Sequence, residues 1–244
     1  MEKISSIEDD VNGLKTLRVI QGAGNFNRWI YQTIKPFCSG EILEIGSGIG
    51  NMSQFFLEEG YLITLSDINN TYCEELRDHF SSFSNLRGII HLDIACNNFE
   101  KEYKDYFCEY DTIFSLNVIE HIRDDHLVIS NCHNLLKPNG ILVVLVPAYP
   151  KLYNKFDTAL KHHRRYTKKS LNKLITENNF KIMKSKYFNA IGILGWYISG
   201  KLQEHQTIPS HQMNLYDKLV FIFKVMDRIL LNKIGLSVIA VAQK

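Results

Sequence analysis

The pattern of apolar and polar residues predicts strands that alternate with helices along most of the chain. Short apolar runs, typical of strands buried on both faces, occur at residues 41–45, 61–67, 87–93, 111–117, 141–148 and 181–189. Apolar residues at helical spacing lie between them, at residues 27–37, 52–60, 72–80, 124–136 and 171–175. Alternation at this interval implies right-handed crossovers, and so a doubly wound, parallel α/β sheet.

The two ends of the chain follow other patterns. Residues 1–24 are mixed and polar, so we expect a loosely ordered lead-in, and residues 149–169 fit no simple period. Two apolar helical stretches, 190–202 and 214–231, precede a terminal strand at 235–244. We expect the helices of 190–231 to form a lid over a pocket. Packing against the sheet or a homodimer mate is the alternative, and a peripheral membrane contact is a third, because basic residues flank the apolar face at Lys218, Lys224, Arg228 and Lys233.

The charge is distributed unevenly. Residues 1–150 carry 11 Lys and Arg against 21 Asp and Glu, whereas residues 151–201 carry 12 against 2. The basic block indicates either an anionic partner or substrate, or a solvated basic face. No run of 18 apolar residues occurs, and the first ten residues are acidic, so we expect a cytoplasmic protein. The five cysteines have no paired short spacing, which argues against a zinc site and a disulfide framework.

Polar groups follow four of the predicted strands, at the point where each strand ends. The first strand leads into a loop with glycine at positions 46, 48 and 50, which suits close approach of a nucleotide-type ligand to the backbone. The next three strands end in Asp67, Asp93 and Asn117. Because the carboxyl ends of parallel strands meet at one edge of the sheet, we expect these groups to converge, with Asp67 placed to accept both hydroxyls of a ribose.

These motifs together resemble the class I S-adenosylmethionine-dependent methyltransferases. The resemblance covers residues 38–148 and rests on EIGSGIG, LSD, HLDIA, FSLNVIEHI and LLKPNGILVVLVP. It implies a seven-stranded, mostly parallel, Rossmann-like sheet whose antiparallel last strand lies beside the sixth, with a helical lid inserted before that last strand. It also implies one domain over residues 1–244, in which 25–150 bind the cofactor, 151–233 form the substrate side and lid, and 234–244 form the last strand.

The family's cofactor residues carry over onto matching positions of this chain. The resemblance implies that Glu44 and the loop residues wrap the amino-acid end of S-adenosylmethionine, that Asp67 holds its ribose, and that Asn117 offers a backbone carbonyl to its ammonium group. Ile68, Asp93 and Ile94 would surround the adenine. The full predicted set is Glu44, Gly46, Ser47, Gly48, Gly50, Asp67, Ile68, Asp93, Ile94 and Asn117.

Three side chains are candidates for chemistry at the methyl acceptor. His121, which would start a helix beside the sulfonium together with Glu120, is the first candidate for a general base, followed by His163 and Tyr166. Arg164 and Arg165 would either clamp an anionic group or pair with the acidic first half of the chain. We expect no metal site, because the adjacent histidines 162 and 163 point apart in regular structure and no carboxylate is spaced to complete one.

The function that this pattern predicts is methyl transfer to an oxygen or nitrogen atom of a small molecule. The HHRRYT segment and the apolar tail resemble a bacterial subset associated with sugars, lipids or secondary metabolites. RNA methylation is the alternative that the basic block favours, although the block has few interleaved aromatics and no RNA-binding module fits in the length. A protein that binds the cofactor without catalysis is a second alternative, and we expect no DNA partner.

Overall fold

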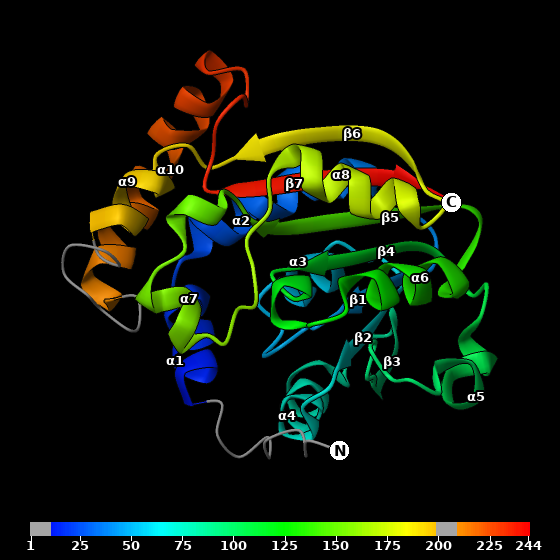
Figure 1. Cartoon of the computed structure of the whole chain (residues 1–244). Coiled ribbons are helices and arrows are strands. Elements are labelled where there is room, and N and C mark those ends of the chain that lie inside the picture. Colours follow the sequence, from blue (N-terminus) through cyan, green and yellow to red (C-terminus); the bar gives the residue numbers. More distant parts are fainter. Residues whose placement is uncertain (1–10, 199–208) are drawn as a thin grey trace.

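The computed structural model describes residues 11–198 and 209–244, which surround one central sheet (Figure 1). The order of its seven strands is β3-β2-β1-β4-β5-β7-β6. Strands β1 to β5 pair in parallel, and β7 lies antiparallel between β5 and β6. The strands are Ile42–Ile45, Ile63–Asp67, Leu86–His91, Tyr110–Leu116, Leu136–Pro147, Lys181–Phe188 and Ser237–Gln243, numbered β1 to β7. The predicted doubly wound, mostly parallel sheet of seven strands is confirmed.

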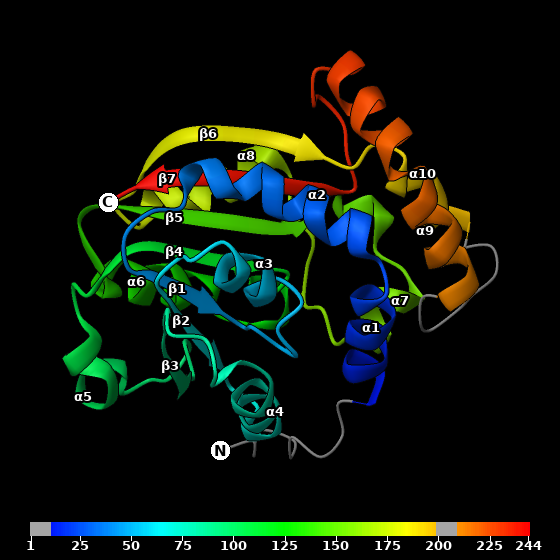
Figure 2. The ribbon, with the colours of Figure 1, turned by 180° about the vertical axis from the view of Figure 1, so that it is seen from behind.

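Helices cover both faces of this sheet. Helices α6 and α8 lie on the face turned toward the viewer in Figure 1, and α2 and α3 lie on the opposite face in Figure 2. The helices are α1 Val11–Gln21, α2 Gly24–Ile34, α3 Ser53–Glu58, α4 Asn70–Phe80, α5 Phe99–Tyr103, α6 Asp125–Leu135, α7 Lys155–Ala159, α8 Lys168–Glu177, α9 Gly192–Tyr197 and α10 Ser210–Ile229. Short 3₁₀ turns occur at Lys35–Phe37 (η2), Lys104–Tyr106 (η3), Ile119–His121 (η4) and Pro150–Leu152 (η5).

The core consists of one apolar cluster on each face of the sheet, because successive side chains of a strand point to opposite faces. Leu43 and Ile113 belong to the cluster beneath α6 and α8. Their neighbours Ile42 and Phe114 belong to the cluster beneath α2 and α3. All four side chains are fully buried, which fixes the register of the central strands and therefore the positions of the loops at their carboxyl ends.

Three local predictions differ from the structure. Residues 11–21, expected in a loose lead-in, form α1, and residues 1–10 lie outside the described ranges. The KPNG sequence at 137–140 predicts a proline-glycine turn before the fifth strand, but these residues are part of β5, where Asn139 has a positive φ of 65° and the pairing with β4 shifts register. Glu120 does not start a long helix, because η4 ends at His121 and α6 begins separately with Asp124 as its N-cap.

Helix α10, in the apolar segment before the last strand, lies against α2 and the turn that follows β6. Asp217 on α10 accepts hydrogen bonds from the Phe26 N–H (2.8 Å) and the Asn25 side chain (3.0 Å), and this fixes α10 against α2. Asp227 accepts from the backbone N–H groups of Asn189 and Ala190, at 2.7 and 2.8 Å. Part of the predicted stretch 190–202 lies outside the described residues, and the lid stays a prediction. Within the described ranges, no helix combines the length and apolarity that crossing a membrane requires.

Candidate active site

The loop after β1 is shaped by glycines in the left-handed region. Gly46, Gly48 and Gly50 have φ angles of 71°, 55° and 85°. A Cβ on Gly46 would lie 2.4 Å from a methyl group of Val118, and one on Gly50 would lie 2.2 Å from the Phe80 ring. No side chain other than hydrogen is accommodated at these two positions without movement. The loop backbone is therefore held close to its neighbours and presents its own polar groups at the strand edge.

Asp67 ties the end of β2 to this loop. One carboxylate oxygen accepts a hydrogen bond from the Gly48 N–H at 2.8 Å, and the other accepts from the Asn69 N–H at 2.9 Å. A carboxylate oxygen can accept more than one hydrogen bond, so these contacts are compatible with the predicted ribose contact. The next side chain, Ile68, is 41% exposed, and it offers the apolar surface that an adenine ring would need.

Glu44 and Ser47 lie beneath the loop. The Ser53 hydroxyl donates a hydrogen bond to the Glu44 carboxylate, and the Ser47 hydroxyl accepts one from the Ser66 N–H at 3.1 Å. Burial raises the pKa of Glu44 to about 8, although hydrogen bonds from Ser53 and Ser47 act in the opposite direction. The carboxyl group is therefore protonated over a wide pH range until a cation such as an ammonium group approaches.

We predict that the Glu44 proton makes the ligand-free protein less stable as pH rises. Between the unfolded pKa of about 4.3 and the folded pKa of about 8, the folded state holds a proton that the unfolded state has lost. The free energy of unfolding should therefore fall with pH in this window, by roughly 1 kcal/mol per pH unit from this group. Urea unfolding from pH 5 to 8 should give a shallower fall for Glu44→Gln, and parallel curves would contradict the prediction.

The remaining predicted cofactor residues differ in exposure. Asp93 is half-buried, and one of its oxygens accepts a hydrogen bond from the Ala95 N–H at 3.0 Å. Ile94 is buried in the core cluster beneath α6 and α8. Asn117 is exposed and has a positive φ of 56°, which turns the chain at the end of β4 toward η4. Asp93 therefore lies two residues after β3 and Asn117 directly after β4, whereas the Ile94 side chain packs inward.

Helix α1 borders the glycine loop. Leu17 on α1 lies against Gly48, and its carbonyl oxygen accepts a hydrogen bond from the Asn51 side chain at 3.0 Å. Helix α1 thus covers the loop, which the mixed pattern of residues 1–24 did not indicate. A surface groove lined by residues including Asn25, Arg28 and Asp217 lies on the α2 side and contains none of the predicted strand-end acids.

The predicted catalytic histidines lie near the end of β4. The His121 side chain is exposed, and its ring lies against that of His162. Protein atoms around the imidazole, followed by the neighbouring His162, lower the pKa of His121 below its ordinary value, so its imidazole is neutral at neutral pH. His163 is exposed, and its backbone N–H donates to the Glu120 carbonyl at 2.7 Å. This bond holds the basic segment against η4.

Tyr166 and Arg164 have protein partners on α6. The Tyr166 hydroxyl donates to Asp125 at 2.8 Å, and burial together with this bond raises the pKa of the phenol. Arg164 pairs with the same carboxylate at 2.7 Å. These contacts favour a structural role for Tyr166, and they match the ion-pair alternative for Arg164, because Asp125 belongs to the acidic first half of the chain.

The buried acid of the basic segment is Asp157, which the sequence analysis did not single out. One of its oxygens accepts hydrogen bonds from Arg165 Nε (2.7 Å) and His162 Nδ1 (2.8 Å). The Arg165 guanidinium lies over the Trp196 ring, 4.5 Å from its centroid. Asp157 is one of only two acids among residues 151–201, and that isolation among basic residues was the available signal.

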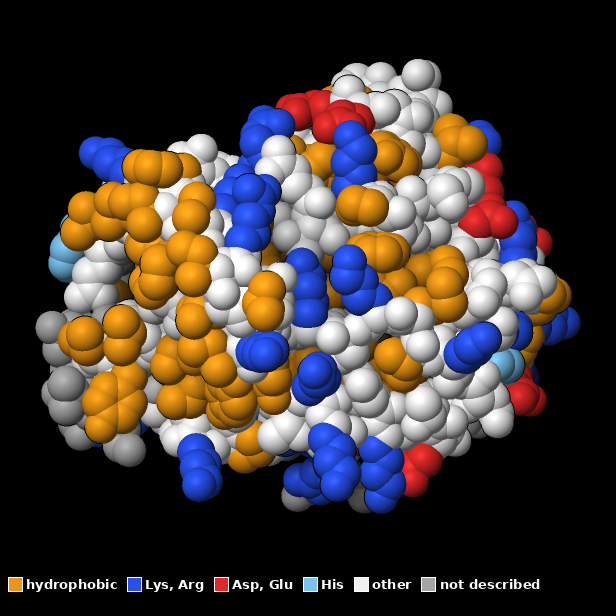
Figure 3. Space-filling model, turned by 90° about the horizontal axis from the view of Figure 1, so that it is seen from above, with side chains coloured by type: hydrophobic (Ala, Val, Ile, Leu, Met, Phe, Trp, Pro, Cys, Tyr) orange, Lys and Arg blue, Asp and Glu red, His pale blue; other side chains and the backbone are white. Residues whose placement is uncertain are grey.

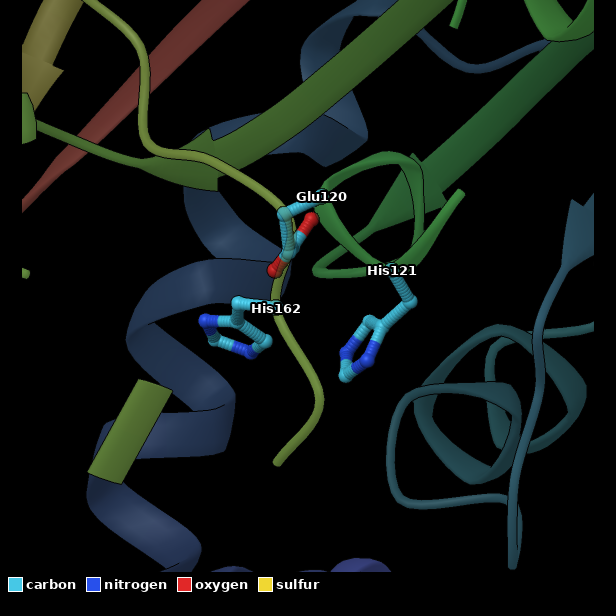
Figure 4. A group of neighbouring side chains, drawn as sticks. All are labelled: Glu120, His121 and His162. Carbon is cyan, nitrogen blue, oxygen red and sulfur yellow. The ribbon is translucent and has the colours of Figure 1, made fainter. Parts of the chain in front are cut away.

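The structure also brings a carboxylate beside His162. Glu120, His121 and His162 place their ligand atoms within 4.8 Å of one another (Figure 4). The expectation of no metal site rested on His162 with His163. The structure instead places Glu120 beside His162, from a segment about 40 residues earlier in the chain.

The glycine loop, the acids at the ends of β2 and β3 and the turn at Asn117 together fit an adenosyl cofactor with an amino-acid tail. The loop offers backbone groups, Asp67 offers carboxylate oxygens, and Ile68 offers an exposed apolar face. Each of these groups lies at the carboxyl end of a parallel strand, where doubly wound sheets bind ligands.

Comparisons with known proteins agree with an S-adenosylmethionine site at this edge of the sheet. A family model described as a methyltransferase domain matches residues 27–185. A Dictyostelium discoideum protein named probable polyketide synthase 30 is 29% identical over 162 residues, which cover 57% of this chain and 5% of that protein. The chain thus spans about a twentieth of the length of the curated relatives that it matches.

Solved methyltransferase structures share the fold. A S-adenosylmethionine-dependent methyltransferase from Archaeoglobus fulgidus has a TM-score of 0.58 and 16% identity, covering 89% of this chain and 94% of that chain. Phosphoethanolamine N-methyltransferase 2 from Haemonchus contortus, solved with S-adenosylmethionine, has a TM-score of 0.57 and 18% identity, covering 90% and 52%. Since the family model covers more than half of the chain, the protein belongs to the class I S-adenosylmethionine-dependent methyltransferases.

Proposed function

We propose that this methyltransferase transfers the methyl group of S-adenosylmethionine to an oxygen or nitrogen atom of a small molecule. The observation that carries the proposal is the position of His121, which is exposed and lies four residues after Asn117 at the end of β4. A polar side chain that can meet an acceptor therefore adjoins the predicted place of the sulfonium. The proposal also includes the predicted cofactor set given above and the role of residues 151–233 as the substrate side.

Methyl transfer from a sulfonium is an in-line displacement with a neutral leaving group. The chain's main tasks are therefore to align the acceptor with the methyl group and to exclude water. An acceptor hydroxyl or ammonium must also lose a proton. The neutral imidazole of His121 has the free lone pair for this task, so we retain it as the first candidate for the base. His163 is exposed nearby and is the second candidate.

The contacts of the basic segment favour a small acceptor over RNA. Arg164 and Arg165 pair with Asp125 and Asp157, so neither guanidinium is free to neutralise a phosphate. Lysines 161, 168 and 169 are exposed, but Tyr166, the aromatic residue between them in the sequence, is buried and does not offer its ring to a base. The acceptors named for the similar proteins differ from one another, so we propose no single acceptor.

The test is detection of methylated product. The protein is incubated with S-adenosylmethionine carrying an isotopically labelled methyl group and with pools of small molecules or of RNA, and labelled products are identified by mass spectrometry. Calorimetry should in parallel show binding of S-adenosylmethionine and S-adenosylhomocysteine, with much weaker binding of NADH. Label in RNA alone would overturn the choice of acceptor class. Cofactor binding without any product from broad pools would favour the non-catalytic alternative.

We also propose a peripheral contact with an anionic membrane through α10. Its outer face exposes Leu215, Phe221, Val225 and Ile229, with Phe221 and Ile229 68% and 67% exposed. Figure 3 shows hydrophobic side chains gathered on the left, over α9 and α10, with Lys and Arg side chains among and beside them. An apolar helix face with flanking cations suits the boundary between acyl chains and anionic headgroups.

Phe221→Glu with Ile229→Glu should abolish sedimentation with vesicles that contain phosphatidylserine. Because both side chains are mostly exposed, the free energy of unfolding should change by only about 0.5 kcal/mol. Vesicles of neutral lipid are the control, and wild-type protein should bind them less. If the wild type does not bind vesicles but forms a dimer in sedimentation equilibrium, and these substitutions dissociate that dimer, the partner of this helix face is a second copy of the chain and not a membrane.

A further inference from the structure

The Glu120 carboxylate is buried without a partner. The side chain is fully buried, and neither of its oxygens has a hydrogen-bond partner among the described residues. Burying an unpaired carboxylate costs several kcal/mol, so native proteins rarely leave one unsatisfied. The contacts of the protein alone therefore do not explain why this position holds a glutamate rather than an apolar residue.

Two imidazole rings converge on this carboxylate. His121 is its neighbour in η4, and His162 comes from the segment after α7, as Figure 4 shows. The two ring centroids are 4.5 Å apart and the ring planes are nearly perpendicular. The ligand atoms of the three side chains all lie within 4.8 Å of one another. Two ligands of one ion at about 2.2 Å each are at most about 4.4 Å apart, so small side-chain shifts would complete a site.

His162 is oriented as a metal ligand would be. Its Nδ1 lies 2.8 Å from Asp157 Oδ1, and the Tyr153 hydroxyl donates to its backbone carbonyl at 2.7 Å. A neutral ring that donates from Nδ1 keeps its lone pair on Nε2, and the hydrogen bonds fix this tautomer. Metal-ligating histidines characteristically donate their other N–H to a carboxylate in this way.

The charged side chains around Glu120 do not supply it with a counter-ion. The positive charge of Arg165 acts on Glu120, but Arg165 Nε bonds to Asp157 and one terminal nitrogen donates to the Ala148 carbonyl at 3.0 Å. Burial raises the pKa of Glu120 to about 8, with Asp157 adding to the rise, and burial lowers that of His121. A bound cation would favour the ionised carboxylate and the neutral imidazoles, which are the forms that coordinate.

We propose that Glu120, His121 and His162 bind one divalent transition-metal ion. Two imidazoles and one carboxylate suit Zn²⁺, Co²⁺ or Ni²⁺ better than Mg²⁺ or Ca²⁺, which prefer oxygen ligands. Three protein ligands leave at least one coordination position open, as in catalytic zinc sites.

The metal site extends the proposed methyl transfer. The role of the ion in the reaction rests on that proposed function. His121 and Asn117 are both exposed, so the three side chains lie beside the surface from which an acceptor would approach. A hydroxyl bound to the ion would lose its proton at lower pH than a free hydroxyl. In this arrangement His121 acts as a ligand rather than as a free base, and the acceptor is an oxygen-bearing molecule.

The binding test uses full-length protein stripped of metal by a chelator, without cofactor or acceptor. Calorimetry with Zn²⁺ and with Co²⁺ should give one site per chain, with much weaker binding of Mg²⁺. Glu120→Gln and His162→Ala should each weaken Zn²⁺ binding at least tenfold. The matched control is His126→Ala, which removes an exposed histidine of α6 outside the cluster and should bind as the wild type does. Wild-type binding in Glu120→Gln, or no Zn²⁺ site in the wild type, would overturn the proposal.

A second measurement guards against variants that fold poorly. Glu120→Gln keeps the side-chain volume and removes the carboxyl group that must lose its proton to bind a metal ion, so without metal it should melt near the wild-type temperature. Excess Zn²⁺ should raise the Tm of the wild type and leave that of Glu120→Gln unchanged. An equal rise in both would assign the ion to another site. Because these two measurements need no acceptor, absence of metal binding would leave the methyltransferase assignment intact. Equal turnover with and without metal would overturn only the role of the ion in acceptor activation.

Discussion

Alanine in place of Asp67 is expected to weaken binding of S-adenosylmethionine by about ten- to a hundredfold. Hydrogen bonds to a charged group contribute about 1.5–3 kcal/mol, and about 1.4 kcal/mol corresponds to a factor of ten in affinity. The substitution removes the predicted ribose contact. It also removes the acceptor of the Gly48 and Asn69 N–H groups, which keeps the glycine loop in place.

Calorimetric titration with the cofactor and with S-adenosylhomocysteine would measure this loss. Asp67→Asn keeps one acceptor oxygen and should lie between the wild type and Asp67→Ala. Asp78→Ala removes an exposed acid from α4, so it changes the net charge equally and should leave affinity unchanged. An Asp67→Ala protein that binds as tightly as the wild type would remove Asp67 from the cofactor site.

The sheet and the cofactor edge could be predicted because their signals are local. A strand buried on both faces is rich in apolar residues, and Ile42, Leu43 and Ile45 of β1 supply them directly. Ile63 and Leu65 do the same in β2. The glycines and the strand-end acids follow those runs in sequence. The antiparallel place of β7 came from the family resemblance, since an apolar run alone does not indicate its direction.

The acceptor side could not be predicted because its contacts join distant segments. Tyr166 and Asp125 are 41 residues apart, and neither position shows a pattern that identifies the other. The cluster of Glu120 with His162 depends in the same way on where β4 and the segment after α7 end. Helix α1 was missed because Gly13 and the glycines at 22 and 24 suggested breaks, although apolar residues recur at helical spacing in Val11–Gln21. Its contact with Gly48 is tertiary.

Alanine in place of Asp157 should destabilise the folded protein by about 3–5 kcal/mol, the scale of breaking a buried ion pair. The Asp157 side chain is fully buried, and the paired Arg165 side chain is 1% exposed. The second carboxylate oxygen accepts from the Asn154 N–H at 2.9 Å, which starts α7. Removing the carboxylate leaves the guanidinium buried without its counter-ion and His162 without its orienting partner.

The pH dependence of this loss follows from the same contacts. Burial alone would raise the pKa of Asp157, but the hydrogen bond from His162 and the charge of Arg165 hold it below the ordinary value. A depressed folded pKa contributes stability that is present above the unfolded pKa of about 3.9 and is lost as pH falls through the folded pKa. The gap between the wild type and Asp157→Ala should therefore be full at pH 7 and shrink in acid below about pH 4.

Urea unfolding of both proteins at pH 7 and at pH 3 would measure the gap. Glu177→Ala is the control, because that half-exposed acid pairs only with exposed partners and should cost less than about 1 kcal/mol. If the stranded charge causes the loss, Asp157→Ala should cost less in an Arg165→Met background than in the wild type. Equal costs in the two backgrounds would mean that the helix start at Asn154, rather than the ion pair, accounts for the stability that Asp157 provides.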